Sequence, residues 1–179
     1  GGAVAAVGGG PHIDHVQFVG NSAFQGAGLY QHDPLMQGVH NTIFAGNFAD
    51  EGGGMYLGNM LFSVNTNVVL IGNMGLVRGG AVALGPANAY SPRFYNLTGV
   101  RNVSLDIAGF SWSDPEANGP YFYSSIVRNN ETQGNGGPYV PMNLVRAYDS
   151  NVAGTPQGDH VYDDAPGFVG ELTSADQVT

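Results

Sequence analysis

A repeat of about 26 residues runs through the first half of this 179-residue chain and limits the folds that are open to it. Asn21, Asn47 and Asn73 lie one repeat apart, and each follows a short, mostly apolar run that ends in glycine. Glycine pairs recur with the same spacing, for example at 53–54 and 79–80. A repeat of about 20–50 residues is typical of solenoids, in which one unit is too small to bury its own apolar face and stacks on the next.

Within each unit, short runs of alternating or β-branched residues are separated by Gly, Asn and Asp. This pattern is typical of strands joined by turns, and no stretch has apolar residues at the 3.6-residue period of a helix. We therefore predict an all-β solenoid whose coils contribute strands to parallel sheets, with neighbouring strands about 4.8 Å apart.

Stacking of the coils would place equivalent residues above one another. One inward column is expected from Phe18, Phe44, Leu70 and Val127. Asparagine tolerates the left-handed conformation of a turn, and its amide can bond to the coils above and below, so a ladder of asparagines is expected as well. The predicted ladder consists of Asn21, Asn47, Asn73, Asn130 and Asn151.

The phase of the repeat breaks at about 85–123, a stretch that reads as an inserted excursion rich in turn-forming residues. The pattern resumes at 125–139, and a weaker copy at 147–151 follows after a shortened step, from Asn130 to Asn151. We predict one parallel β-helix domain over residues 1–170, with coils of about 21–26 residues, followed by a polar tail or cap at 171–179.

The residues from 44 to 56, which include three glycines at 52–54, resemble the coils of right-handed parallel β-helix proteins of the pectate-lyase-like superfamily. The likeness is greatest to surface β-helices of the polymorphic outer membrane protein and adhesin-like type. The segment 163–169 is similar to the one that often follows the last coil in such repeats, and the resemblance covers about 1–84 and 124–169. It implies a right-handed β-helix. This fold is shared by lyases, hydrolases, epimerases, adhesins and structural fibres, so the fold alone does not identify the function.

The composition excludes several classes of function. The formal net charge is −9, and all five basic residues are arginines, whereas nucleic acids and anionic membranes require a basic footprint. The chain has no lysine and no cysteine, which removes lysine catalysis, thiolate chemistry and cysteine-ligated metals. No membrane span is predicted, because no run of about 18 apolar residues is present. Uncharged polar residues must cover the surface, which favours an extracellular location, and no cofactor is predicted.

Histidines and one aspartate near the N-terminus form the candidate metal site. A shift of one repeat places His40 above Asp14 and Asn41 above His15. Asp14, His15 and His40 could then bind a divalent cation, and calcium is the ion that the scattered carboxylates of the chain would favour. The alternative is a solvated turn with an Asp–His contact.

Aromatic residues flank a polar loop at 113–120. The rings of Trp112, Tyr121 and Tyr123, beside the carboxylate of Asp114, suit the apolar face and hydroxyl edges of a sugar, so we expect them to contact a polysaccharide or another glycan. The alternative is that these rings pin an inserted loop to the flank of the solenoid.

Asn96 and Asn102 satisfy the N-x-S/T rule and are the candidate glycosylation sites. Asn130 satisfies the rule too, but its predicted place in the ladder argues against a glycan there.

These observations predict an extracellular structural or adhesive module of a cell surface or filament, which works by self-association and glycan contact. The chain opens in the middle of a repeat, so its first coil would expose unpaired strand edges. Such edges predict end-to-end stacking on another copy or on further coils of a longer chain.

The alternative is a carbohydrate-active enzyme, either a polysaccharide lyase or a glycoside hydrolase. Such a site would require Asp106, Asp114 and Glu116 to converge, with Arg101 or Arg128 nearby.

Overall fold

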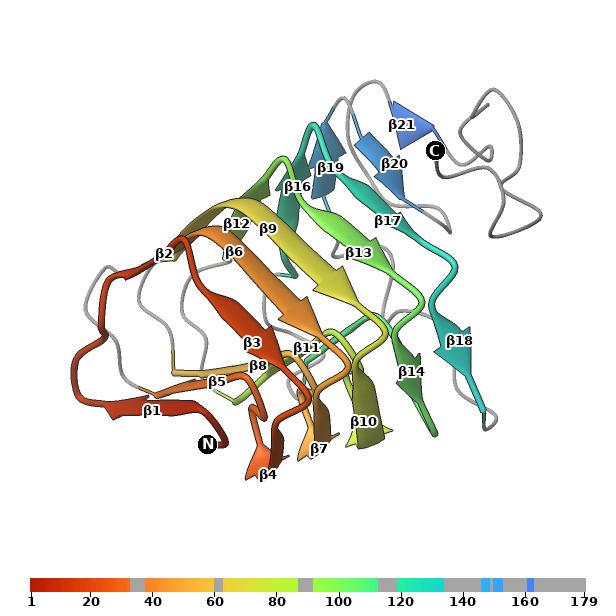
Figure 1. Cartoon of the computed structure of the whole chain (residues 1–179). Coiled ribbons are helices and arrows are strands. Elements are labelled where there is room, and N and C mark those ends of the chain that lie inside the picture. Colours follow the sequence, from red (N-terminus) through yellow and green to blue (C-terminus); the bar gives the residue numbers. More distant parts are fainter. Residues whose placement is uncertain are drawn as a thin grey trace, which may run out of the picture.

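A computed structural model describes residues 1–32, 38–59, 63–86, 92–112, 119–133, 146–148, 150–152 and 161–162. All regular secondary structure in these ranges is β-strand, which confirms the all-β prediction. The strands form a parallel β-solenoid of about four turns with three parallel sheets (Figure 1). In this part of the chain no helix is long and apolar enough to cross a membrane.

Sheet A runs along one side of the solenoid. It contains β1 (Val4–Val7), β5 (Leu29–His32), β8 (Met55–Gly58), β11 (Val82–Leu84) and β15 (Phe110–Trp112). Sheet C runs along another side. It contains β4 (Ser22–Gln25), β7 (Phe48–Glu51), β10 (Met74–Arg78), β14 (Val103–Ser104) and β18 (Glu131–Thr132).

Sheet B is the widest, and it carries the surfaces discussed below. Its earlier strands are β2 (Ile13–Asp14), β3 (Gln17–Val19), β6 (Val39–Ala45), β9 (Val64–Ile71), β12 (Arg93–Tyr95) and β13 (Thr98–Val100). Its later strands are β16 (Tyr121–Tyr123), β17 (Ile126–Arg128), β19 (Arg146–Tyr148), β20 (Ser150–Val152) and β21 (Val161–Tyr162).

The core lies between the three sheets and is built from columns of inward side chains. Phe18 stacks on Phe44 with ring centroids 4.8 Å apart, and Phe44 pairs in register with Leu70. Gly99 follows Leu70 in this register and precedes Val127. The predicted column is therefore confirmed, with Gly99 as the member that the sequence did not reveal.

A line of left-handed residues divides sheet B lengthwise. Within β6 and β9, Asn41 and Asn67 have φ of 48° and 54°. His15, Asn96 and Ser124 occupy the same place in their own coils, with φ from 48° to 55°. A left-handed residue turns the strand, so the side chains before and after this line cover two separate outer surfaces.

The predicted excursion at about 85–123 is wrong for the described residues. β12, β13, β14 and β15 pair in register with the strands of the preceding coil. The described strands of this stretch therefore continue the stack of coils. The sequence repeat was not recognised here because its length changes. The step from Asn73 to Asn102 is 29 residues, and the next step, to Asn130, is 28.

The repeat length before the final strands also differs from the prediction, which was a shortened step from Asn130 to Asn151. Tyr148 pairs with Tyr123, and Asn151 pairs with Ile126. The equivalent step from Ser125 to Ser150 is 25 residues, so this coil is close to the length of the first ones. Residues 163–179, with the predicted tail or cap, lie outside the described residues.

Candidate functional site

A buried ladder of asparagine side chains runs along the corner between sheets B and C. Asn73 Oδ1 accepts hydrogen bonds from the backbone N–H of Asn47 at 3.1 Å and from its side-chain amide at 2.9 Å. Asn102 Oδ1 receives the same two bonds from Asn73, at 3.0 and 2.9 Å. The amides of Asn47, Asn73, Asn102 and Asn130 also donate to backbone carbonyls, as Asn73 does to Phe44 at 3.0 Å. The side chains of the ladder bond to neighbouring coils, so the ladder holds the coils together.

The ladder differs from the predicted one in two members. Asn102 takes the position after Asn73, and it donates to Asn130 Oδ1 at 2.8 Å. Asn151 does not belong to it, because it lies in register with Ile126. Asn102 is fully buried, so it is not a glycosylation acceptor in the folded chain. Asn96 remains an exposed candidate on the outer surface of sheet B.

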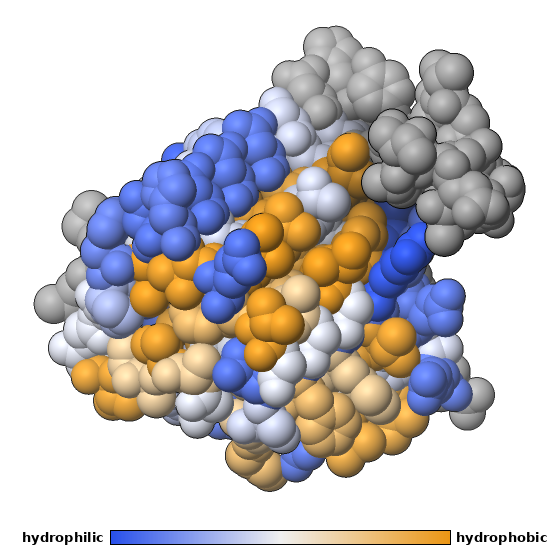
Figure 2. Space-filling model, in the orientation of Figure 1, coloured by the Kyte–Doolittle hydropathy of each residue, from blue (hydrophilic) through white to orange (hydrophobic). Residues whose placement is uncertain are grey.

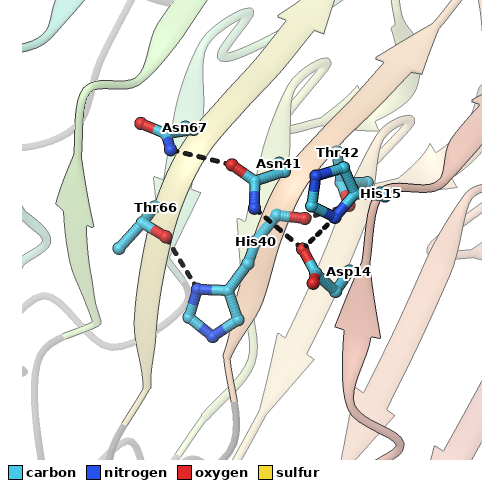
Figure 3. A network of polar contacts seen from close by, with 7 residues as sticks. All are labelled: Asp14, His15, His40, Asn41, Thr42, Thr66 and Asn67. Atoms are coloured by element: carbon cyan, nitrogen blue, oxygen red, sulfur yellow. Dashed lines mark hydrogen bonds and ion pairs between the residues drawn. The ribbon is translucent and has the colours of Figure 1, made fainter.

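An outer strip of polar and aromatic residues follows the left-handed line on sheet B, and Figure 3 shows its N-terminal part. One column of the strip consists of Asp14, His40, Thr66, Tyr95, Tyr123 and Tyr148. Beside it, Asn96 donates to Asn67 at 3.1 Å, Asn67 to Asn41 at 2.8 Å, and Asn41 to Asp14 Oδ1 at 2.8 Å. We call the six residues of the column and these three asparagines the polar strip.

The predicted metal site does not form at the N-terminal end of the polar strip. His15 Nδ1 lies 2.8 Å from Asp14 Oδ1, whereas His40 Nδ1 lies 2.7 Å from the hydroxyl of Thr66. Figure 3 shows His40 directed at Thr66, away from the Asp14 carboxylate. No group of three or more metal-ligating side chains occurs among the described residues. The hydrogen bond from Asn41 is the main cause that lowers the pKa of Asp14, with a smaller contribution from His15.

The C-terminal end of the polar strip is a stack of tyrosines. The rings of Tyr95 and Tyr123 are 4.5 Å apart and inclined by 9°, and those of Tyr123 and Tyr148 are 5.0 Å apart and inclined by 10°. Tyr121 lies nearly parallel to Tyr123 at 6.4 Å, and the Arg93 guanidinium lies 6.0 Å from the centroid of the Tyr121 ring. Partial burial, together with the nearby phenols, raises the pKa of Tyr123.

The predicted glycan-contact residues are not brought together. Trp112 belongs to β15 in sheet A, whereas Tyr121 and Tyr123 belong to β16 in sheet B. Asp114 lies outside the described residues. The two faces of the Tyr123 ring are covered by Tyr95 and Tyr148, so they are closed to a sugar ring. Sequence reasoning missed these two partners because it took their surroundings for an excursion and for a shorter coil.

Only one of the three acids of the alternative enzyme site lies among the described residues. Asp106 is exposed in the loop that follows β14, and Asp114 and Glu116 lie outside the described residues. Arg101 occupies a left-handed corner with φ of 56°, and Arg128 ends β17.

A partly buried carboxylate links three coils on sheet C. Glu51 Oε2 accepts hydrogen bonds from Gln25 at 3.0 Å and from Arg78 at 3.1 Å. Burial alone would raise the pKa of Glu51, but the hydrogen bonds and the charge of Arg78 outweigh it and hold the pKa below its usual value of 4.5. The carboxylate is therefore ionised at neutral pH and unsuited to donate a proton as a general acid.

We expect the contribution of Glu51 to stability to disappear in acid. Because its pKa is lower in the folded chain, ionised Glu51 stabilises the fold fully above the unfolded pKa of about 4.5, and this contribution is lost as the pH falls through the lower folded value. Urea unfolding of the wild type and of Glu51→Gln should therefore differ most near neutral pH, and the difference should shrink as the pH falls through the lowered pKa of folded Glu51. Two curves that stay parallel over the whole range would contradict the assignment.

The other outer surface of sheet B is mostly apolar. It is formed by the outward side chains of β3, β6, β9, β13 and β17 beyond the left-handed line, and we call it the apolar face. Its apolar members are Val19, Ile43, Ala45, Val69, Ile71, Val100 and Ile126, and Gln17, Thr98 and Arg128 occupy the remaining outward positions. Figure 2 shows apolar side chains across this part of the molecule, bordered by hydrophilic ones. Val19 is 61% exposed and Ile71 is 36% exposed.

The apolar surface continues around the corner onto sheet C. There Phe24 is 72% exposed and Val77 is 51% exposed, and Phe48, Leu76 and Leu105 are exposed as well. Large contiguous apolar surfaces are rare on proteins that act alone and mark sites of interaction. Sequence reasoning did not single out this surface, although the residues that alternate with Phe18, Phe44 and Leu70 carried the signal.

No protein-family model, no curated protein and no solved structure matches the chain.

Proposed function

We propose that this chain is an extracellular structural or adhesive module of a cell surface or filament, which works by lateral association of two copies through the apolar face. The observation that carries the proposal is the exposed apolar surface on sheets B and C, which includes Val19 and Phe24. The resemblance of the coils to surface β-helices of the adhesin-like type agrees with this role.

The distribution of charge favours a second copy as the occupant. The chain carries 14 acidic residues and a net charge of −9, so two copies have the same sign of net charge and repel each other. Beyond the left-handed line, the outward positions of β3, β6, β9, β13 and β17 hold no acid, and Arg128 is their single charged residue. Repulsion between acidic side chains therefore does not oppose the close approach of two copies at this face.

An antiparallel pair of solenoids would have a two-fold axis through the interface, as a self-complementary interface requires. We place this axis near Ile71, which is 36% exposed and belongs to the third coil. The fourth coil of one copy then lies over the second coil of the other.

Sedimentation velocity tests the proposal. We expect the wild type to associate reversibly and Ile71→Glu to weaken association by at least about tenfold, because the introduced carboxylate would be buried without a partner. Val7→Glu is the matched control, because Val7 is 71% exposed but lies in sheet A, and it should leave association unchanged.

A wild type that stays monomeric at 18.6 kDa at high concentration contradicts the proposal. Polymers that Ile71→Glu leaves intact contradict the lateral interface as well, and they favour end-to-end stacking on the edge strands.

A further inference from the structure

The tyrosine stack at the end of the polar strip holds three phenol rings nearly parallel and close to one another. Tyr95, Tyr123 and Tyr148 come from three successive coils, and their rings lie 4.5 and 5.0 Å apart with inclinations of 10° or less. All three side chains are partly exposed. The ring faces cover one another, so what the stack offers to solvent is a row of ring edges and phenol hydroxyls.

We propose that this stack is a site of oxidative phenol coupling, at which Tyr123 forms a covalent dityrosine bond to Tyr95 or Tyr148. The ligand class is a one-electron oxidant, such as the activated haem of a peroxidase that is supplied with hydrogen peroxide. The bond would join neighbouring coils of one chain and is independent of the association of two copies.

The reaction balances with peroxide as the oxidant. Two phenols each give up one electron to the oxidant and one proton to water, which leaves two phenoxyl radicals. The radicals combine between the ring carbons next to the hydroxyls, and each of these carbons then passes its hydrogen to the phenol oxygen through solvent. Two protons and two electrons have left the chain, and they convert one hydrogen peroxide into two waters.

The geometry favours this stack over the second pair of stacked tyrosines. Tyr30 and Tyr56 lie 5.2 Å apart with an inclination of 10°, but Tyr56 is only 5% exposed. The oxidant therefore has less access to that pair. Tyr123 has a stacked partner on each side, so a radical formed on it meets a second phenol whichever neighbour is oxidised.

Arginine-specific cleavage makes the products easy to assign, because the chain has no lysine. Tyr95 falls in peptide 94–101, Tyr121 and Tyr123 fall in peptide 102–128, and Tyr148 falls with Tyr162 in peptide 147–179. Fragmentation of the linked peptides then identifies the tyrosine on each side. After treatment with peroxidase and hydrogen peroxide, we expect dityrosine fluorescence, an intact chain lighter by two hydrogen atoms, and peptide 102–128 linked through Tyr123.

Matched variants decide the question. Tyr123→Phe keeps the ring but removes the phenol, so most of the intramolecular dityrosine should be lost, whereas Tyr30→Phe should leave the yield unchanged. The circular dichroism spectrum of each variant checks that it folds. The proposal is overturned if Tyr123→Phe retains the wild-type yield, or if dityrosine appears only in covalent dimers whose yield rises with protein concentration.

The melting temperature of the oxidised chain distinguishes a cross-link between neighbouring coils from oxidative damage elsewhere. Tyr95 and Tyr123 lie one coil apart in the chain, so a bond between them restricts the unfolded chain, and we expect the Tm to rise by about 6–12 °C. Oxidised chains with an unchanged or lowered Tm would also overturn the proposal.

Discussion

Replacing Asn73 by alanine is expected to lower the free energy of unfolding by about 3–5 kcal/mol. The substitution removes the oxygen that accepts from the backbone N–H and the side chain of Asn47, and the amide that donates to the Phe44 carbonyl. Asn73 and Asn47 are buried, so water cannot replace these bonds without entering the core. Urea unfolding followed by circular dichroism measures the loss.

Asn67→Gly is the matched control for this prediction. Asn67 belongs to the exposed asparagines of the polar strip, where its amide donates to Asn41 at 2.8 Å and its side-chain oxygen accepts from Asn96 at 3.1 Å. Glycine accepts its φ of 54°. Water replaces both lost bonds at this exposed position, so the cost should stay within about 0.5 kcal/mol. Equal losses in the two variants would show that burial of the ladder is not what makes it stabilising.

Replacing Gln31 by leucine is expected to raise the free energy of unfolding by about 1–3 kcal/mol. Gln31 is fully buried, and neither its side-chain oxygen nor its nitrogen has a hydrogen-bond partner. Leucine already occupies this place in the next two coils, as Leu57 and Leu84. The substitution therefore removes two unpaired polar atoms and keeps a side-chain volume that the column accepts.

Gln25→Leu is the companion to this experiment. Gln25 donates to Glu51 at 3.0 Å, so the same chemical change at this position removes a hydrogen bond and should destabilise the chain. If Gln31→Leu also destabilises the chain in urea unfolding, the amide of Gln31 is satisfied in solution and the prediction fails.

Much of the fold could be predicted because the repeat is strict at the positions that build it. Phe18, Phe44 and Leu70 recur in phase, and so do Asn21, Asn47 and Asn73, because a parallel register repeats each inward contact once per coil. A solenoid needs little more than this pattern to specify its sheets.

The register of the later coils could not be predicted in the same way. Extra residues lengthen the steps to Asn102 and Asn130, and Gly99 stands where the core column has a large side chain in other coils. Contacts with other coils fix these positions, and a search for a constant period does not detect them.

The candidate surfaces were the least predictable part. The tyrosine stack depends on the register of Tyr95 and Tyr148 with Tyr123, which the broken period concealed. Spacing alone predicted the metal site, but His40 bonds to Thr66 and not to Asp14. Proximity along the repeat says which residues are neighbours, whereas side-chain direction decides which of them bond.

Chemical cross-linking of a single introduced cysteine tests lateral association most directly, because the chain has no cysteine of its own. Ile71 lies beside the inferred two-fold axis, so Ile71→Cys in one copy should face the same residue in the other. Under mild oxidation we expect Ile71→Cys to give a disulfide-linked dimer and Val7→Cys, on sheet A, to stay monomeric. Equal cross-linking of both variants, or none with Ile71→Cys at concentrations where the wild type associates, would contradict the account.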